Sequence, residues 1–575
     1  MSQTNRHTLL SGTVVTSLGT LASRILGLVR DTVTASLFGL ASGGVLDALV
    51  IAFRIPNLFR ALFGEGALTA SYLPIFSESL EQNHGRAGRL FQATTRWLVR
   101  LLLALTIIGE IGLGCAAWLA REDSRTVLLF GLSAAMLPYL ILVCLAALAS
   151  ATLQAVGSFA WPALAPAVLN ICWIAGAAAI APQVAGSADR QAYILAVCIL
   201  TGGALQWAVQ WPALWRAGFT LRASAKSNFP SLPPGEGRGE GACDAFPAPS
   251  PCPLPKGEGS ELATDDDSAE PLRRIRMGML PTMVALTVTQ LNTLSDSIVA
   301  WLLAAPEHGS KTIAWLGVNY PLEQGAAAAI YLGERLYQFP LGLIGIAAGT
   351  AVFPLLSAHA ARGDSAAVAR DLSLGLRLVL WLAIPSSVGL VIFAEPIARL
   401  MFEHEHFTAA DASRAAGMIA VYGSAVWAYC VLPVLVRGFY AMNDRTTPLR
   451  VALIAVVLNV ALDFTLIWFF AERGLAAATA VSAIVQAALL AIWFSRRHVA
   501  IDWHKLAGSA IRASLAAAVM AAVGVLALYQ IPVQPGNWNA LLRLAIPLTV
   551  CLVSFAVVVL AVGRSDWREF LARRS

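Results

Sequence analysis

The sequence has little charge for its length. Only 13% of its 575 residues are Asp, Glu, Lys or Arg, against roughly 25% in an average soluble protein. Hydrophobic residues make up 57% of the chain and the mean hydropathy is +0.68. Apolar runs recur along the whole sequence, at about the 20 residues needed to cross ~30 Å of hydrocarbon. This composition excludes a soluble globular protein and predicts a polytopic membrane protein.

Cysteine is also scarce and follows no pattern. None of the eight cysteines forms a CxxC pair, and most lie in apolar runs, where we expect them to be small packing residues. The sequence therefore predicts neither a disulfide framework nor a metal site. Walker A, GxSxG and HExxH motifs are absent as well, which removes the common ATPase and hydrolase signatures. We expect a protein that is not an enzyme and has no resident cofactor.

The apolar runs predict helices. They are rich in leucine and alanine and lack strict alternation, which favours helices over the strands of a membrane barrel. We expect an all-α fold with about fourteen transmembrane helices. Arginine pairs such as Arg86 and Arg89, or Arg496 and Arg497, all fall on one side of the predicted topology. The positive-inside rule then places both termini in the cytoplasm. Topology accounts for the net charge of +6, so we expect no nucleic-acid partner.

One stretch interrupts the apolar pattern. Residues 223–272 contain "FPSLPPGEGRGEG" and "TDDDSAE", a composition typical of disordered segments. We interpret this stretch as a cytoplasmic linker, and favour a passive connection over a docking segment. It separates residues 1–222 from residues 273–497, and each of these regions is expected to form a lobe of six helices. Residues 498–575 are expected to add two more helices and a basic cytoplasmic tail.

The two halves resemble each other. "EGALTASYLPIFSES" after the second span corresponds to "AAGTAVFPLLSAH" after the eighth. "LQAVGSFAWPALAPAVLN" likewise corresponds to "FYAMNDRTTPLRVALIAVVLN", with a slip of a few residues. Because each repeat has an even number of spans, both begin on the same side of the membrane. Parallel repeats of this kind are typical of transporters that bind substrate between the two halves.

Charged residues crowd the first two predicted spans, and they are Arg24, Arg30, Asp31, Asp47, Arg54, Arg60 and Glu65. A charge in mid-membrane costs about 3 kcal/mol on insertion scales, so such residues usually face a water-filled cavity. The excess of arginine predicts an anionic guest, because the guanidinium fork binds phosphate through two hydrogen bonds. Arg335, beside Glu334 in the eighth span, is expected to join this cavity. The alternative is a set of structural ion pairs, with Arg30 and Asp31 at the outer interface and Arg60 extending to the inner one.

A second polar set lies in the seventh, eleventh and twelfth spans. Asn459 and Asp463 are four residues apart on one helix face, and Asp296 and Thr479 lie in the other two spans. These oxygen ligands would suit a small cation such as Na⁺, or a proton relay. Hydrogen bonding between helices is an equally simple explanation.

Several long motifs resemble one known family. They are "SRILGLVRD", "DALVIAFRIPNLFRALFGEGALTASYLPIF", "ERLYQFPLGLIGIAAGTAVFP" and "GFYAMNDRTTPLRVA". Through them the chain from about Ser11 to Arg497 resembles the MurJ (MviN) family of bacterial lipid II flippases. That family belongs to the multidrug/oligosaccharidyl-lipid/polysaccharide exporter superfamily. The insert at residues 223–272 departs from the family pattern.

The resemblance implies a function. The chain would move lipid II, the undecaprenyl-diphosphate-linked disaccharide peptide, across the bacterial cytoplasmic membrane by alternating access. Positions matching the family motifs carry the central-cavity charges Arg24, Arg30, Asp47, Arg54, Arg60 and Arg335. Of these, Arg24, Arg30 and Arg335 would hold the diphosphate. Asp296, Asn459, Asp463 and Thr479 resemble a sodium-binding set, so Na⁺ is the candidate coupling ion.

The resemblance also implies partners. The last two helices would form a groove for the polyprenyl tail, and membrane lipids and cell-wall synthesis proteins would be partners. Two alternative functions are export of another polyprenyl-linked glycan or of drugs, and a membrane enzyme activity on polyprenyl phosphates. The arginine excess favours a diphosphate over a cationic drug. The enzyme would need an acidic or histidine cluster at an interface, and the sequence shows none.

Overall fold

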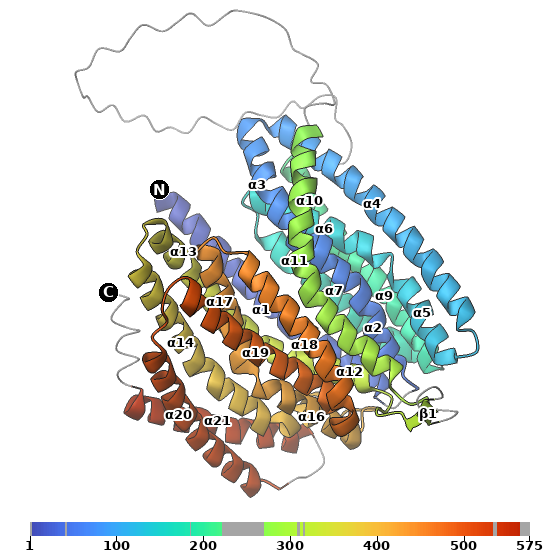
Figure 1. Cartoon of the computed structure of the whole chain (residues 1–575). Coiled ribbons are helices and arrows are strands. Elements are labelled where there is room, and N and C mark those ends of the chain that lie inside the picture. Colours follow the sequence, from blue (N-terminus) through green and yellow to red (C-terminus); the bar gives the residue numbers. More distant parts are fainter. Residues whose placement is uncertain are drawn as a thin grey trace, which may run out of the picture.

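The protein, described here from a computed structural model, is a bundle of long helices (Figure 1). The structure describes residues 3–40, 43–184, 186–220, 269–306, 311–313, 317–532 and 537–563. Within these ranges the only sheet is a hairpin of β1 (Thr312–Ile313) and β2 (Val318–Asn319), which pair antiparallel. The prediction of an all-α membrane fold is therefore confirmed.

The N-lobe comprises the helices before the long insert. They are α1 (Gln3–Phe38), α2 (Val45–Phe59), the π-helix η1 (Arg60–Gly66), α3 (Ala67–Gln82), α4 (His84–Leu119), α5 (Ser124–Met136), α6 (Tyr139–Ala155), α7 (Ala160–Ala175), the π-helix η2 (Gly176–Ile180), α8 (Ala181–Val184), α9 (Ala188–Ala208) and α10 (Trp211–Arg216).

The C-lobe comprises the helices from α11 to α19. They are α11 (Ala269–Leu302), α12 (Ala326–Pro340), the π-helix η4 (Leu341–Ile346), α13 (Ala347–Ala361), α14 (Ser365–Ile392), α15 (Ala394–Phe402), α16 (Ala409–Ser424), α17 (Val426–Ala441), α18 (Thr446–Phe470) and α19 (Glu472–Arg497). Two further helices, α20 (Trp503–Gln530) and α21 (Asn537–Val562), follow the C-lobe.

The expected number of membrane-crossing segments agrees with the structure. Ten helical segments of the described chain are long and apolar enough to cross a membrane, and α16 with α17, bent by 44°, makes an eleventh. The three other long helical stretches are α1, α2 through α3, and α11. Their polar residues lower their hydropathy, and several of these residues face the cavity described below. Counting these three stretches as well gives fourteen, the number expected from the sequence, of which ten or eleven are apolar enough to be identified as membrane-crossing.

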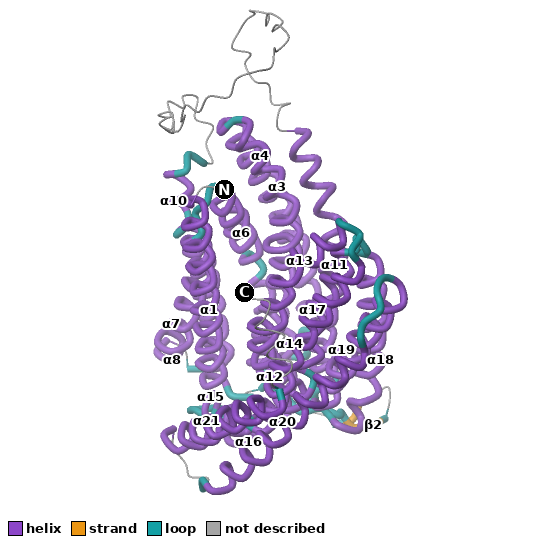
Figure 2. Tube along the Cα trace, turned by 90° about the vertical axis from the view of Figure 1, so that its left-hand side faces the viewer, coloured by secondary structure: helices purple, strands orange, loops and turns teal. Residues whose placement is uncertain are grey.

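The lobes lie on either side of a central space. Figure 1 shows α4, α5 and α9 on one side and α14, α17 and α19 on the other, and Figure 2 separates α1 and α7 from α17, α18 and α19. Helix α11 bridges the lobes, because it packs against α3 of the N-lobe and α18 of the C-lobe. Helix α20 packs on α14, and α21 packs on α15 and α20.

The predicted linker at residues 223–272 lies outside the described residues up to position 268. Its last four residues belong to α11, which begins at Ala269. The disorder expected for the rest of this segment stays a prediction.

The two lobes use the same local structures at matching positions. In both, an α-helix passes through a π-helix into a second α-helix, as α2–η1–α3 and as α12–η4–α13. The inner corners are the turns between α6 and α7 and between α17 and α18. Each is a six-residue turn with a left-handed residue, Gly157 at φ 79° and Asn443 at φ 59°. The N–H of Ser158 donates to the Leu153 carbonyl at 2.8 Å, and that of Asp444 to Phe439 at 2.9 Å. These are the C-terminal caps that favour glycine or asparagine.

Candidate functional site

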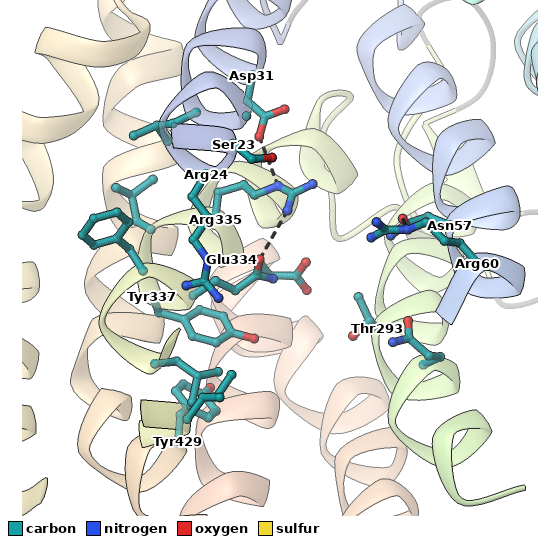
Figure 3. Close-up of a pocket in the computed structure, with 18 of the residues that line it drawn as sticks. Ser23, Arg24, Asp31, Asn57, Arg60, Thr293, Glu334, Arg335, Tyr337 and Tyr429 are labelled. Atoms are coloured by element: carbon teal, nitrogen blue, oxygen red, sulfur yellow. Dashed lines mark hydrogen bonds and ion pairs between the residues drawn. The ribbon is translucent and has the colours of Figure 1, made fainter. Parts of the chain in front are cut away.

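A cavity of about 1500 Å³ lies between the lobes (Figure 3). Its walls come from α1, α2, α6, α7 and α9 of the N-lobe and from α11, α12, α17, α18 and α19 of the C-lobe. The residues predicted from the sequence that line it are Arg24, Arg30, Asp31, Arg60, Asp296, Glu334, Arg335 and Thr479. The volume exceeds the 300–1,000 Å³ that is usual for small-molecule pockets, so the cavity can hold a large headgroup.

One carboxylate joins arginines from the two lobes. Asp31 Oδ1 lies 2.7 Å from Arg30 Nη2, and Asp31 Oδ2 lies 3.1 Å from Arg335 Nε. The Tyr331 hydroxyl accepts from Arg335 Nη2 at 2.6 Å and donates to Asp31 at 3.1 Å. Arg30 and Asp31 are 6% and 5% exposed, so most of each side chain is covered by the protein. Asp31 therefore pairs with its sequence neighbour Arg30 and also with Arg335 of the other lobe.

Arg30 is held on several sides by the N-lobe. Its guanidinium lies 4.5 Å from the Trp173 ring centre and 5.7 Å from that of Phe53. Its Nη1 donates to Asn170 Oδ1 at 3.2 Å. Such packing fixes the orientation of the guanidinium before any ligand arrives, and the ring faces stabilise its charge.

Among the described residues, Arg24 is the cavity arginine whose polar atoms have no partner. Its side chain is exposed and makes no hydrogen bond or ion pair with any residue that the structure describes. The guanidinium of Arg24, on α1, lies against Gly342 in η4, where an added Cβ would overlap it. Figure 3 shows Arg60 and Asn57 across the cavity from Arg24 and Arg335. Arg60 Nε donates to Asn57 Oδ1 at 2.9 Å.

Asp47 and Arg54 connect the lobes. The sequence groups them with the cavity residues, but the structure gives their terminal polar atoms partners in the C-lobe. The Asp47 carboxylate accepts the backbone N–H groups of Gly325 and Ala328, each at 2.8 Å, and so caps the start of α12. Arg54 Nη2 lies 2.7 Å from Glu334 Oε2, and both side chains are buried. The side chain of Glu65, in η1, falls outside what the structure describes.

The second predicted set comes together inside the C-lobe. Asn459 Nδ2 donates to Asp296 Oδ1 and to Asp463 Oδ2, both at 2.9 Å, and Thr479 Oγ1 donates to Asp296 Oδ2 at 2.9 Å. Asp296, Asn459 and Asp463 are fully buried. Asn459 Oδ1 and Asp463 Oδ1 have no hydrogen-bond partner among the described residues. The carboxylates of Asp296 and Asp463, with the amide oxygen of Asn459, form a donor set that suits a small cation, because buried charge requires a counterion.

A polyvalent metal site does not emerge from the described residues. No group of three or more His, Cys, Asp or Glu side chains in these ranges is placed to hold a metal ion.

The lobes also touch at the end that carries the hairpin. The His406 N–H donates to the Ser36 carbonyl at 3.2 Å. The Arg125 guanidinium donates to the carbonyls of Trp301 and Ala304, each at 3.1 Å, and lies 3.9 Å from the Trp301 ring centre. Together with the Asp47 cap, these contacts close the cavity at this end.

The sequence reasoning missed the uncharged polar residues of the cavity. Gln206, Gln290 and Gln486 all line it, and Tyr331 and Asn170 orient its arginines. The only signal available was that these residues interrupt apolar spans, and single uncharged residues do so at little cost.

Comparison with known proteins gives one consistent result. The family model described as "Lipid II flippase MurJ" matches residues 34–546. The chain is 30% identical over 499 residues to a Vibrio cholerae serotype O1 protein named "Probable lipid II flippase MurJ", covering 84% of this chain and 82% of that protein.

Two solved structures resemble this chain in fold. One is titled "Lipid II flippase MurJ, inward closed conformation", with a TM-score of 0.67 at 21% identity, covering 95% of this chain and 99% of that one. Another is an inward-facing multidrug resistance MATE family transporter of the MOP superfamily. Its TM-score is 0.59 at 12% identity, covering 83% of this chain and 94% of that one.

Proposed function

Because the chain belongs to the lipid II flippase MurJ family, we propose that it translocates lipid II from the inner to the outer leaflet of a bacterial cytoplasmic membrane. The observation that carries this proposal is the meeting of Arg30 and Arg335, from different lobes, on Asp31 in one cavity, with the unused guanidinium of Arg24 beside them. A cavity that gathers cations from both lobes suits a large anionic headgroup.

The arginines would replace water around the diphosphate. Moving an ionised headgroup through hydrocarbon without partners is prohibitive. Arg24 and Arg335 each offer a planar fork that makes paired hydrogen bonds to phosphate oxygens. The polyprenyl tail would stay in lipid, along a groove formed with α20 and α21. With the inside negative, the membrane potential favours outward movement of negative charge by about 2.3 kcal/mol per charge per 100 mV. No covalent step is needed.

The cycle would proceed by alternating access. Both termini and the linker would lie in the cytoplasm, and the hairpin would lie outside. The contacts of Asp47, His406 and Arg125 close the hairpin end, so this arrangement corresponds to a cavity shut toward the outside. Outward release would require these contacts to break while the opposite ends of the lobes approach each other.

Sodium is the proposed coupling ion. The unpaired oxygens of Asn459 and Asp463, together with the Asp296 carboxylate and the Thr479 hydroxyl, would hold it. A cation there would neutralise carboxylates next to α11, the helix that bridges the lobes, so its binding would bias their relative positions. Removing the ion would leave buried acids without a counterion.

A strain depleted of its own flippase and complemented with this chain tests the proposal. We expect growth and delivery of lipid II to the outer leaflet to be restored. Arg24→Ala and Arg335→Ala should each abolish delivery, at normal membrane levels of protein. Arg121→Ala is the matched control, because Arg121 packs beside Trp118 at an exposed end of α4. Full delivery by both cavity variants would contradict the arginine mechanism. Export of another polyprenyl glycan without lipid II would favour the related exporter.

A further inference from the structure

The cavity carries uncharged amide side chains that the anion site does not use. They come from both lobes and all line the cavity: Gln154, Gln206, Gln290, Asn292 and Gln486. Because these side chains are uncharged, a ligand that binds them does not need to carry a charge. An amide offers a donor and an acceptor at once, so this lining differs in chemistry from the arginine face.

Each of these amides has at least one polar atom without a partner among the residues that the structure describes. The side chains of Gln154, Gln290 and Gln486 make no hydrogen bond with any residue that the structure describes. Gln206 Oε1 and Asn292 Oδ1 are buried without a partner in the same part of the chain. Buried polar atoms nearly always have a partner in native proteins, and polar groups kept within membrane segments commonly serve a substrate pathway. A ligand that accepts and donates hydrogen bonds would complete them.

Two of the amides lie at the depth of Arg24. Gln290 is twelve residues from the end of α11 at Leu302, and Gln486 is fourteen residues from the start of α19 at Glu472. Arg24 is fourteen residues from the end of α1 at Phe38. With a rise of 1.5 Å per residue, all three lie about 18–21 Å from the hairpin end of their helices. Gln290 and Gln486 therefore line the C-lobe wall at the level of the unused cavity arginine.

We infer that Gln290 and Gln486 form a subsite for an N-acetylated sugar of the headgroup. This assignment rests on the proposed function, in which arginines bind the diphosphate. The group bonded directly to that diphosphate is a sugar. With the diphosphate held by Arg24, this sugar lies close to the residues at the same depth in the membrane, which are Gln290 and Gln486. The amides bind its hydroxyl and N-acetyl groups, which are uncharged donors and acceptors. The subsite selects the glycan, and the arginines hold the phosphates.

Binding to the full chain in nanodiscs tests the assignment, with lipid II and undecaprenyl diphosphate as the two probes. The double variant Gln290→Leu/Gln486→Leu should bind lipid II about tenfold more weakly and undecaprenyl diphosphate as the wild type does. Arg24→Ala should weaken both probes. Because neither glutamine has a hydrogen-bond partner among the described residues, the double variant should unfold at no lower a temperature than the wild type.

Gln210→Leu is the matched control. Gln210 accepts from the Ser150 hydroxyl at 2.9 Å and donates to the Ala146 carbonyl at 3.2 Å, so its loss should lower stability without changing the preference between the probes.

Each other outcome has a distinct meaning. If the double variant binds both probes equally more weakly, the subsite is overturned. If it binds both as the wild type does, the subsite is also overturned, because water then satisfies the amides. A wild type that binds undecaprenyl diphosphate as tightly as lipid II also overturns it and leaves the diphosphate site standing. A wild type that binds neither lipid overturns the proposed function and the subsite together.

Discussion

The first helix of each lobe carries a buried charge held by an asparagine, and the two charges are opposite. In the N-lobe, Arg30 on α1 donates to Asn170 Oδ1 on α7. In the C-lobe, Asp296 on α11 accepts from Asn459 Nδ2 on α18. The two asparagines end the matching stretches "AVLN" and "VVLN". One amide serves both lobes because its oxygen accepts from arginine and its nitrogen donates to carboxylate.

The comparison shows how one repeated scaffold can orient charges of opposite sign. The repeat retains the neutral partner and changes only the charge that it orients. At these matched positions the N-lobe carries a cation and the C-lobe a carboxylate, and both Arg30 and Asp296 line the cavity. Arg54 and Glu334 pair across the lobes and are a second case of opposite charges at matching places. Arg54 lies in α2, which precedes η1, and Glu334 lies in α12, which precedes η4.

The largest effect is expected from breaking that pair between the lobes. Arg54→Ala leaves Glu334, only 5% exposed, buried without its cation, which should cost about 3–5 kcal/mol. The variant should therefore unfold at a clearly lower temperature in detergent. The double variant Arg54→Ala/Glu334→Gln removes the stranded charge and should recover most of the loss. Equal stability of Arg54→Ala and wild type would show that the pair does not hold the lobes.

The next effect separates the two ion sites. Asp463→Asn should abolish the thermal stabilisation that NaCl gives over KCl, since the carboxylate that would bind the cation is gone. Its affinity for undecaprenyl diphosphate should remain that of the wild type. Asn170→Ala is the matched counterpart and should weaken diphosphate binding while keeping the sodium effect. A sodium effect unchanged in Asp463→Asn would contradict the cation site.

A smaller effect is expected from moving Arg24. Gly342→Ala places a methyl group where the guanidinium lies and should displace it from the cavity wall. We expect about a tenfold weaker affinity for undecaprenyl diphosphate, or ~1.4 kcal/mol. Gly112→Ala on α4 has open space around its Cβ and should behave as wild type. Unchanged affinity in Gly342→Ala would mean that Arg24 can bind from another position.

The smallest effect concerns the inner corners. Ser158 in the N-lobe corresponds to Asp444, whose carboxylate accepts the Thr447 N–H at 3.0 Å and the Thr447 hydroxyl at 2.7 Å. Burial acts to raise the pKa of Asp444, but the hydrogen bonds from Thr447 and His498 outweigh it and hold the pKa below its usual value. Asp444→Ser should therefore cost about 1 kcal/mol of stability at pH 7.

The pH dependence of that cost follows from the sign of the shift. A carboxylate with a depressed folded-state pKa stabilises the protein above its unfolded pKa, near 3.9, and this stabilisation is lost as the pH falls toward the folded value. Unfolding followed from pH 7 to pH 3 should show the difference between Asp444→Ser and wild type shrinking at the acid end. A difference that grows on acidification would contradict the assignment.

Much of the fold could be predicted from the sequence. Hydropathy and segment length identify most of the membrane segments, and the repeated motifs give the two halves. The π-helices η1 and η4 could not be predicted, because a single wider turn leaves the apolar pattern almost unchanged. The bend between α16 and α17 could not be predicted either, because the apolar pattern continues through it.

The site could be predicted in part. Charges in apolar runs are rare enough to identify Arg24, Arg30 and Arg335, and the spacing of Asn459 and Asp463 indicated their cluster. Which charges face the cavity depends on helix rotation and on the opposite lobe, and neither is local. Asp47 and Arg54 therefore looked like their neighbours in sequence, although their partners lie in the C-lobe.

The closed hairpin end has a further consequence for the energy of the cycle. Its polar closure consists of a few hydrogen bonds, and each contributes a net ~0.5–1.5 kcal/mol, or about 1.5–3 where one partner is charged. Reversing a two-state population from 1:99 to 99:1 takes about 5.5 kcal/mol of differential affinity. Four of the five closing hydrogen bonds involve Asp47 or Arg125, which are charged, so together they hold the closed end by at least about 6.5 kcal/mol. Under the proposed cycle, the occupant of the cavity would have to contribute differential binding energy of at least this order to open the hairpin end.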